Sequence, residues 1–191
     1  MDSTSEECKD VYAHFGLAMY LAQCVEQSII QLLIFFDFFD KNAQHWESEE
    51  KWAADFDIFE SAVSKKTMGR LIGSLKNLDN FGQLLDEDLE GLLGEALDKR
   101  NWLAHAYFSD RASHFVHSSG RVEMVAELEE ARGLFKSVED KLNPITYALT
   151  EKYGLTESMV QELASKMKEL GKPEITDEEF KKMLRGVRGN L

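Results

Sequence analysis

The sequence contains only 2 prolines among 191 residues, and it has no run in which apolar and polar residues alternate strictly. β-Sandwiches and barrels need turn residues between many short strands, and their half-buried strands alternate in polarity. The scarcity of both features argues against these folds. With 43% hydrophobic and 30% charged residues, the composition is that of a soluble helical protein. We therefore predict an all-α fold.

Cysteine is also scarce, since Cys8 and Cys24 are the only two. On one continuous helix they would lie about 24 Å apart, at about 1.5 Å per residue, which is too far for a disulfide. Because the chain shows neither a disulfide framework nor a secretory leader, we expect it to be cytoplasmic. Its most apolar run, residues 29–36, is shorter than the roughly 20 residues that span a bilayer and is predicted to be core.

Basic charge is in deficit, because 22 Lys and Arg residues face 35 Asp and Glu residues and the net charge is -13. A protein that coats nucleic acid needs a basic field over much of its surface, so the balance argues against that class. Residues 99–121 are the exception. Here Lys99, Arg100, Arg111 and Arg121, which we call the positive island, stand against Asp110 alone. A local basic cleft is compatible with this distribution.

Several signatures of catalysis or cofactor binding are missing. The sequence has no Gly-x-Ser-x-Gly elbow, no P-loop and no dinucleotide fingerprint, which argues against a serine hydrolase and against nucleotide-binding enzymes with these motifs. His105, Asp110, His114 and His117 could be interpreted as metal ligands, but the segment contains no cysteine and no His-Glu-x-x-His pattern. We expect neither a metal nor another cofactor.

Helical periodicity organises the rest of the chain. Apolar residues recur at helical spacing over residues 5–40, which predicts one long helix whose widely apolar end is deeply buried or meets a second subunit. Further helices are expected over residues 41–63, 64–78, 86–107, 122–142, 144–154 and, as a pair, 155–191. We predict a helical bundle over residues 1–154 and a C-terminal helical extension over 155–191. Turn residues predict a loop over 109–120 and a helix stop at Asn143 and Pro144.

Residues 98–108 combine an arginine, an amide, an imidazole and a phenol within a segment that otherwise has the pattern of a core helix. The apolar stripe of the preceding turns continues onto Arg100, Leu103 and Tyr107. An arginine on an apolar stripe is costly unless a group pairs with it. This cost is the first indication of a site.

Arg100 and His105 together suit the cleavage of RNA without a metal. An imidazole exchanges protons near neutral pH, so it can assist attack by the 2'-hydroxyl or protonate the leaving 5'-oxygen. A guanidinium stays charged and can stabilise the charge that builds on the phosphate oxygens. DNA lacks the 2'-hydroxyl and would not react in this way.

The full pattern, Arg-Asn-x-x-x-His-x-Tyr, resembles the signature of the HEPN superfamily, in the form seen in HEPN toxins that pair with nucleotidyltransferase antitoxins. The resemblance implies a bundle of four or five helices, usually a homodimer, and in many members a metal-independent endoribonuclease. It implies that Arg100 and His105 are catalytic, and that Asn101, Tyr107 and Lys99 support them or bind phosphate. The matching tyrosine of the toxins can be adenylylated by the antitoxin, which makes Tyr107 a possible regulatory target.

Helix geometry complicates this assignment, because residues five apart lie about 140° apart around an ideal helix. Arg100 and His105 can meet if the helix breaks around residues 102–104, if the arginine wraps round the helix, or if two chains assemble the site. We favour two chains. The alternative function is a catalytically silent interaction module, in which Arg100 and His105 pair with acids such as Glu95 or Asp98.

Overall fold

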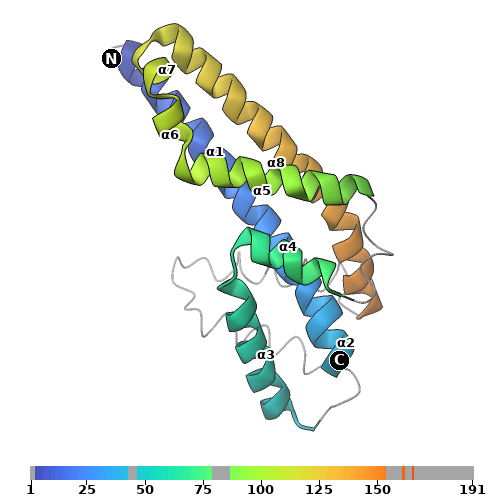
Figure 1. Ribbon diagram of the computed structural model, residues 1–191. Coiled ribbons are helices and arrows are strands. Elements are labelled where there is room, and N and C mark those ends of the chain that lie inside the picture. Colours follow the sequence, from blue (N-terminus) through green and yellow to red (C-terminus); the bar gives the residue numbers. More distant parts are fainter. Residues whose placement is uncertain (1–2, 43–46, 79–86, 154–160, 162–164, 166–191) are drawn as a thin grey trace.

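The computed structural model describes residues 3–42, 47–78, 87–153, 161 and 165, and these are helical except for short connections (Figure 1). No strand occurs in this part of the chain, so the prediction of an all-α fold is confirmed. The predicted extension over 155–191 lies outside the described residues, apart from residues 161 and 165, and so do residues 79–86.

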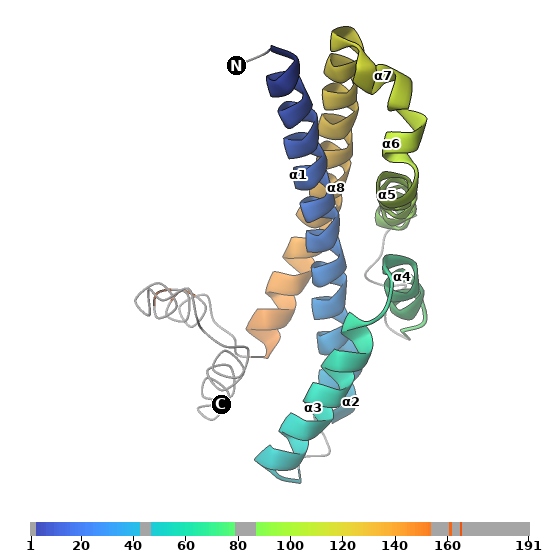
Figure 2. The same cartoon turned by 90° about the vertical axis from the view of Figure 1, so that its left-hand side faces the viewer.

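The helices, with their bounds, are α1 (Ser3–Leu33), η1 (Ile34–Phe39), α2 (Asp40–Asn42), α3 (Glu49–Ser64), α4 (Met68–Lys76), α5 (Glu87–His105), α6 (Tyr107–Asp110), α7 (Ala112–Val116) and α8 (Ser118–Lys152). The two long helices, α1 and α8, lie side by side, and α4 to α7 cover one side of this pair (Figures 1 and 2).

The α1 and α8 helices run parallel. Near their starts Arg121 pairs with Glu7, and further along Ser28 donates a hydrogen bond to Glu139. At the far end Lys152 of α8 pairs with Asp40 of α2, which continues the line of α1. Partners therefore follow each other in the same order along both helices. The chain between them must return to the starting end, and it does so through α3 to α7 (Figure 1).

The core forms where the apolar stripes of α1, α4, α5 and α8 meet. Its most deeply buried side chains include Val11, Ala18, Val25, Ile29 and Leu32 of α1 and Met124, Leu128, Phe135, Val138 and Leu142 of α8. These residues follow the spacing that predicted the helices, so the predicted buried stripes are confirmed. Cys8 and Cys24 are free, as expected for two residues on one continuous helix.

The first helix does not stay α-helical to its end. Residues Ile34–Phe39 form a π-helical segment, in which hydrogen bonds span five residues and the turn widens. Phe38 contacts Trp52, Phe56 and Phe59 of α3, with ring centroids 5.3 to 5.4 Å apart. Trp52, Phe56 and Phe59 therefore share the face of α3 that meets the π-helical segment. The same contacts show that the apolar end of the first helix packs against α3.

Two predicted boundaries are wrong, because α8 is helical from Ser118 to Lys152. The expected turn at residues 118–120 is the first turn of α8, and the expected loop before it contains α6 and α7. Pro144 lies inside the helix, where it lacks the N–H that would bond the carbonyl of Asp140. Leu142 and Leu149, on both sides of the proline, are buried. Their packing holds the helix together, and α8 bends in its orange part (Figure 2).

Gly120 explains why residues 118–120 resemble a turn in the sequence. A Cβ atom at this position would lie 2.5 Å from the Cα and 2.7 Å from the carbonyl carbon of His114. Glycine is required because the backbone of α7 crosses directly over the first turn of α8. Gly133 is a contrasting case in the same helix, since a Cβ there meets nothing within 4 Å.

We expect Gly120→Ala to destabilise the protein by about 1–3 kcal/mol, because the added methyl group forces α7 away from α8. The matched substitution Gly133→Ala should instead stabilise α8 by up to about 1 kcal/mol through helix propensity. Urea unfolding followed by circular dichroism measures both. Equal stability of the two variants would contradict the close contact between α7 and α8.

Candidate functional site

The helix that carries Arg100 and His105 is unbroken between them. The α5 helix runs through His105, and the first residue outside a regular helical conformation is Ala106, with φ -131° and ψ -20°. A break around residues 102–104 is therefore ruled out as the way to bring the two side chains together. On this continuous helix they point about 140° apart.

Arg100 lies at the contact between α5 and α1. Its Nε donates a hydrogen bond to Glu26 Oε1 at 3.1 Å, and its Nη1 is 3.4 Å from Asn101 Oδ1. The Arg100 and Glu26 side chains are only 25% and 18% exposed. The partner is thus an acid of α1 and neither Glu95 nor Asp98. The sequence contains one indication of this partner, because Glu26 is the only acid between residues 10 and 37.

His105 is exposed at the last position of α5. Within the part of the chain that the structure describes, its side chain has no hydrogen bond and no ion pair. Asn101, one turn earlier on the same face, is exposed as well. The imidazole can therefore reach a ligand from solvent, whereas Arg100 is held by its own chain.

Tyr107 belongs to the core. It is 1% exposed, and its hydroxyl donates a hydrogen bond to the backbone carbonyl of Met124 at 3.0 Å. Burial, and to a lesser extent the charge of Glu127, hold the pKa of this phenol well above its ordinary value. Its supporting role is thus to fix α6 against α8. In this conformation the hydroxyl is not accessible to a modifying enzyme.

Two cations next to the motif contact the ring of Trp102, a residue that the sequence pattern did not single out. Lys99 Nζ lies 5.0 Å and the Arg111 guanidinium 5.2 Å from the centroid of its ring, within the range of cation–π attraction. The indole N–H donates to Asp110 at 2.9 Å. Lys99 therefore rests on an aromatic surface of its own chain.

The three arginines of the positive island pair with glutamates. Arg111 makes a two-pronged contact with Glu127 at 2.7 to 3.0 Å, and Arg121 donates to Glu7 at 2.6 and 2.9 Å. Hydrogen bonds from Arg121 and Ser118 lower the pKa of Glu7. With the Arg100 pair included, every arginine of the island has a glutamate partner from α1 or α8. The basic cleft that the sequence allowed is not formed by these arginines in one chain.

The histidines that suggested a metal site have other neighbours. His114 Nε2 lies 3.5 Å from Glu123 Oε2, and Asp110 accepts the hydrogen bond from Trp102. Among the described residues, no three His, Cys, Asp or Glu side chains are grouped closely enough to hold a metal ion.

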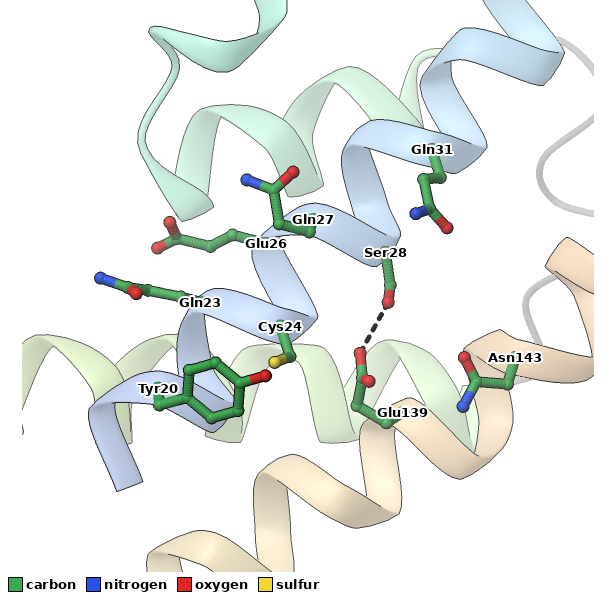
Figure 3. A pocket seen from close by; sticks show the side chains of 9 residues that line it. All are labelled: Tyr20, Gln23, Cys24, Glu26, Gln27, Ser28, Gln31, Glu139 and Asn143. Atoms are coloured by element: carbon green, nitrogen blue, oxygen red, sulfur yellow. Dashed lines mark hydrogen bonds between the residues drawn. The ribbon is translucent and has the colours of Figure 1, made fainter. Parts of the chain in front are cut away.

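An open groove of about 620 Å³ runs between α1 and α8 (Figure 3). Its lining is mostly uncharged and polar, and consists of Tyr20, Gln23, Cys24, Glu26, Gln27, Ser28, Gln31, Glu139 and Asn143. Ser28 donates to Glu139 across it at 2.6 Å. Because Glu26 both lines the groove and binds Arg100, the candidate motif lies at its edge. No pattern in the sequence indicates this groove, because its lining comes from two helices far apart in the chain.

Comparison with protein-family models found no match to this chain, and comparisons with curated proteins and with solved structures found none either. The HEPN resemblance therefore rests on the sequence motif of residues 98–108.

We expect the Arg100–Glu26 pair to contribute about 0.5–1 kcal/mol of coupling energy, because both side chains are largely but not fully withdrawn from water. A double-mutant cycle with Arg100→Gln, Glu26→Gln and the double variant measures it by chemical unfolding. Additive single effects would show that the pair does not hold the two helices together and that Arg100 is free for another role.

We expect Tyr107→Phe to cost about 0.5–1.5 kcal/mol at neutral pH through the lost hydrogen bond. The raised pKa of the folded phenol predicts that its contribution is complete below pH 10, the ordinary value, and is lost as pH rises beyond it. Wild type should therefore lose more unfolding free energy above pH 10 than the variant. Tyr153, whose pKa is also raised, is common to both proteins and cancels. Equal losses of unfolding free energy in the two proteins would contradict the burial of the Tyr107 hydroxyl in its hydrogen bond to Met124.

Proposed function

We propose that this chain is a HEPN-like protein that cleaves RNA without a metal, at a site shared by two copies of the chain. The observation that supports the proposal best is the position of His105, which is exposed and unpaired among the described residues at the end of the motif helix. Asn101 stands beside it on the same face. An imidazole in this setting can take up and release protons during catalysis.

The proposed reaction is an internal transfer at phosphorus. One imidazole removes the proton of the 2'-hydroxyl, and the 2'-oxygen attacks the adjacent phosphate. The bond to the 5'-oxygen breaks, and that oxygen receives a proton from an imidazolium. The products are a 2',3'-cyclic phosphate and a free 5'-hydroxyl. A guanidinium near the phosphate would stabilise the charge of the transition state.

Two copies are needed because of the helix geometry. Arg100 and His105 point in different directions on the unbroken α5, so one chain does not aim both at the same phosphate. A two-fold axis can bring the histidine of one copy near the arginine of the other. Glu26 then has a second role, since its hydrogen bond holds the Arg100 guanidinium at the contact between α5 and α1 until a phosphate competes for it.

A second candidate function is a catalytically silent interaction module of the same fold. The observation that favours it is that each arginine of the positive island already has a glutamate partner. In this case Arg100 stabilises the packing of α5 on α1, and the exposed His105 has no catalytic role. A nucleotidyltransferase-type antitoxin as partner, a role in defence and a cytoplasmic location remain proposals drawn from the sequence.

The first proposal predicts that the purified protein cleaves single-stranded RNA in EDTA, and that His105→Ala and Arg100→Ala each lower the rate at least about 100-fold. RNA with 2'-deoxy nucleotides should stay intact because it lacks the attacking hydroxyl. His117→Ala, which removes another exposed histidine, is the matched control and should retain activity. Cleavage is measured on labelled oligonucleotides.

Undiminished cleavage by His105→Ala would assign the activity to a contaminant or to another site. Intact RNA with the wild-type protein, over a range of sequences, would support the silent module. Circular dichroism of each variant confirms that its helices are retained, so that a lost activity is not mistaken for a lost fold.

A further inference from the structure

Three cations at the start of α4 have no carboxylate partner among the described residues. The side chains of Lys65 and Arg70 are exposed and make no hydrogen bond or ion pair within this part of the chain. The Lys66 side chain donates only to the neutral hydroxyl of Ser74, at 2.9 Å. We call Lys65, Lys66 and Arg70 the basic patch. Within the described part of the chain its charge is uncompensated, in contrast to the arginines of the positive island.

The basic patch does not help α4 to form. A positive charge near the start of a helix opposes the helix dipole, and the first turn of α4 contains no acidic residue. Thr67, the N-cap residue, makes no side-chain hydrogen bond that would cap the helix. Three cations gathered here therefore carry an energetic cost that the described fold does not offset. A bound anion would offset it, as the glutamates do for the positive island.

The α4 and α5 helices lie side by side and run in opposite directions. A Cβ at Gly69 would lie 3.5 Å from the Leu97 side chain. Further along α4, Lys76 pairs with Glu90, which comes earlier in α5. The start of α4 is therefore near the end of α5, and Figure 1 shows the two on the same side of the molecule. The basic patch thus lies at the end of α5 that carries His105.

Asn101 and His105 point towards the same side of the molecule as the basic patch. Around an ideal helix, Asn101 lies about 40° and His105 about 80° from the direction of Leu97, the residue that meets α4. Both are exposed. In the register of the contact between Gly69 and Leu97, α4 begins level with Asp98. His105 lies about 10 Å beyond that level along α5. These two polar side chains and the basic patch therefore border the same stretch of surface.

We propose that the basic patch binds the phosphates of a single-stranded nucleic acid, in a stretch of the strand that continues towards His105. Ammonium and guanidinium groups both bind phosphate, the first as a point charge and the second as a fork of donors. Such contacts hold a strand and set its direction without reading its bases. The cleavage of that strand at His105 rests on the proposed function, whereas the binding does not.

The charge of the whole chain makes this position selective. With a net charge of -13, the protein repels a polyanion over most of its surface. The arginines of the positive island are engaged by glutamates, so they attract a strand only weakly. A strand can approach where cations are uncompensated. This condition directs it to the start of α4 and the end of α5.

An anionic membrane is the competing partner. Helices that lie on membranes insert their apolar face into the lipid and keep Lys and Arg on the polar face. The apolar residues of α4, including Met68, Leu71 and Leu75, are buried in the core of the bundle and cannot insert. The preceding helix, α3, exposes Glu49 and Asp55, which anionic lipid repels. A single strand is narrow enough to contact three cations without a wide basic surface around them.

A labelled single-stranded DNA oligonucleotide tests the binding. DNA presents the same phosphates as RNA, and the proposed reaction leaves it intact because it lacks the 2'-hydroxyl. We expect Lys65→Gln/Arg70→Gln to raise the dissociation constant at least about tenfold at low salt. The slope of log affinity against log salt should fall by about 1.4, since each cation lost from a contact with a single strand contributes about 0.7. Fluorescence anisotropy over a range of salt concentrations measures both.

The matched control is Lys136→Gln, because Lys136 is also an exposed lysine without a partner among the described residues but lies on α8. This change should leave the affinity and the salt slope as they are in the wild type. Failure of the wild type to bind DNA or RNA at low salt would overturn the inference, as would equal losses in Lys65→Gln and Lys136→Gln. Binding to anionic lipid vesicles without binding to oligonucleotides would assign the patch to a membrane.

RNA cleavage by the same variants separates this inference from the proposed function. Binding that depends on the basic patch, with no cleavage by the wild type, leaves the patch standing and removes the nuclease. Cleavage with an unchanged KM in Lys65→Gln/Arg70→Gln does the reverse. If both hold, this variant raises KM for a long RNA at least about tenfold at unchanged kcat, because the patch does not touch the reacting atoms. A dinucleotide, which ends before the patch, should then be cleaved equally by both proteins.

Discussion

The paired charges between helices are the constraint on which the motif region depends. Arg100 joins α5 to α1, Arg111 joins the connection after α6 to α8, and Arg121 joins the start of α8 to α1. Each pair places a cation against a carboxylate in a partly buried setting, where either charge alone would be costly. Together they determine where α5 ends on the α1–α8 pair, and therefore where His105 meets solvent.

The same ion pairs change how the cluster of basic residues in the sequence is interpreted. A cluster of basic residues in an acidic chain resembles a docking surface for an anion, yet its arginines are engaged within the fold. What remains accessible is an imidazole, an amide and a polar groove next to them. A ligand that needs Arg100 must compete with Glu26, so the chain itself sets how strongly an anion has to bind.

The sequence was sufficient for the features that depend on periodicity. The stripes of α1, α5 and α8 were predicted because a buried face repeats every three to four residues. The features it missed depend on which helices meet. Pro144 predicted a stop, but buried leucines on both sides keep α8 helical. Glu26 is an isolated acid in the sequence, but it could not be assigned to Arg100 until α1 was placed beside α5. Gly120 is required by a backbone contact that leaves no periodic trace.

The parallel arrangement of α1 and α8 has a consequence for how the protein acquires its structure. More than one hundred residues separate the partners Glu7 and Arg121, so the central contact of the bundle joins distant parts of the chain. Contacts of this kind form late, because a long loop must close first. During synthesis α1 emerges well before α8 exists to cover it. The nascent chain therefore exposes an apolar helix for most of its translation, a state prone to aggregation that favours early capture by a chaperone.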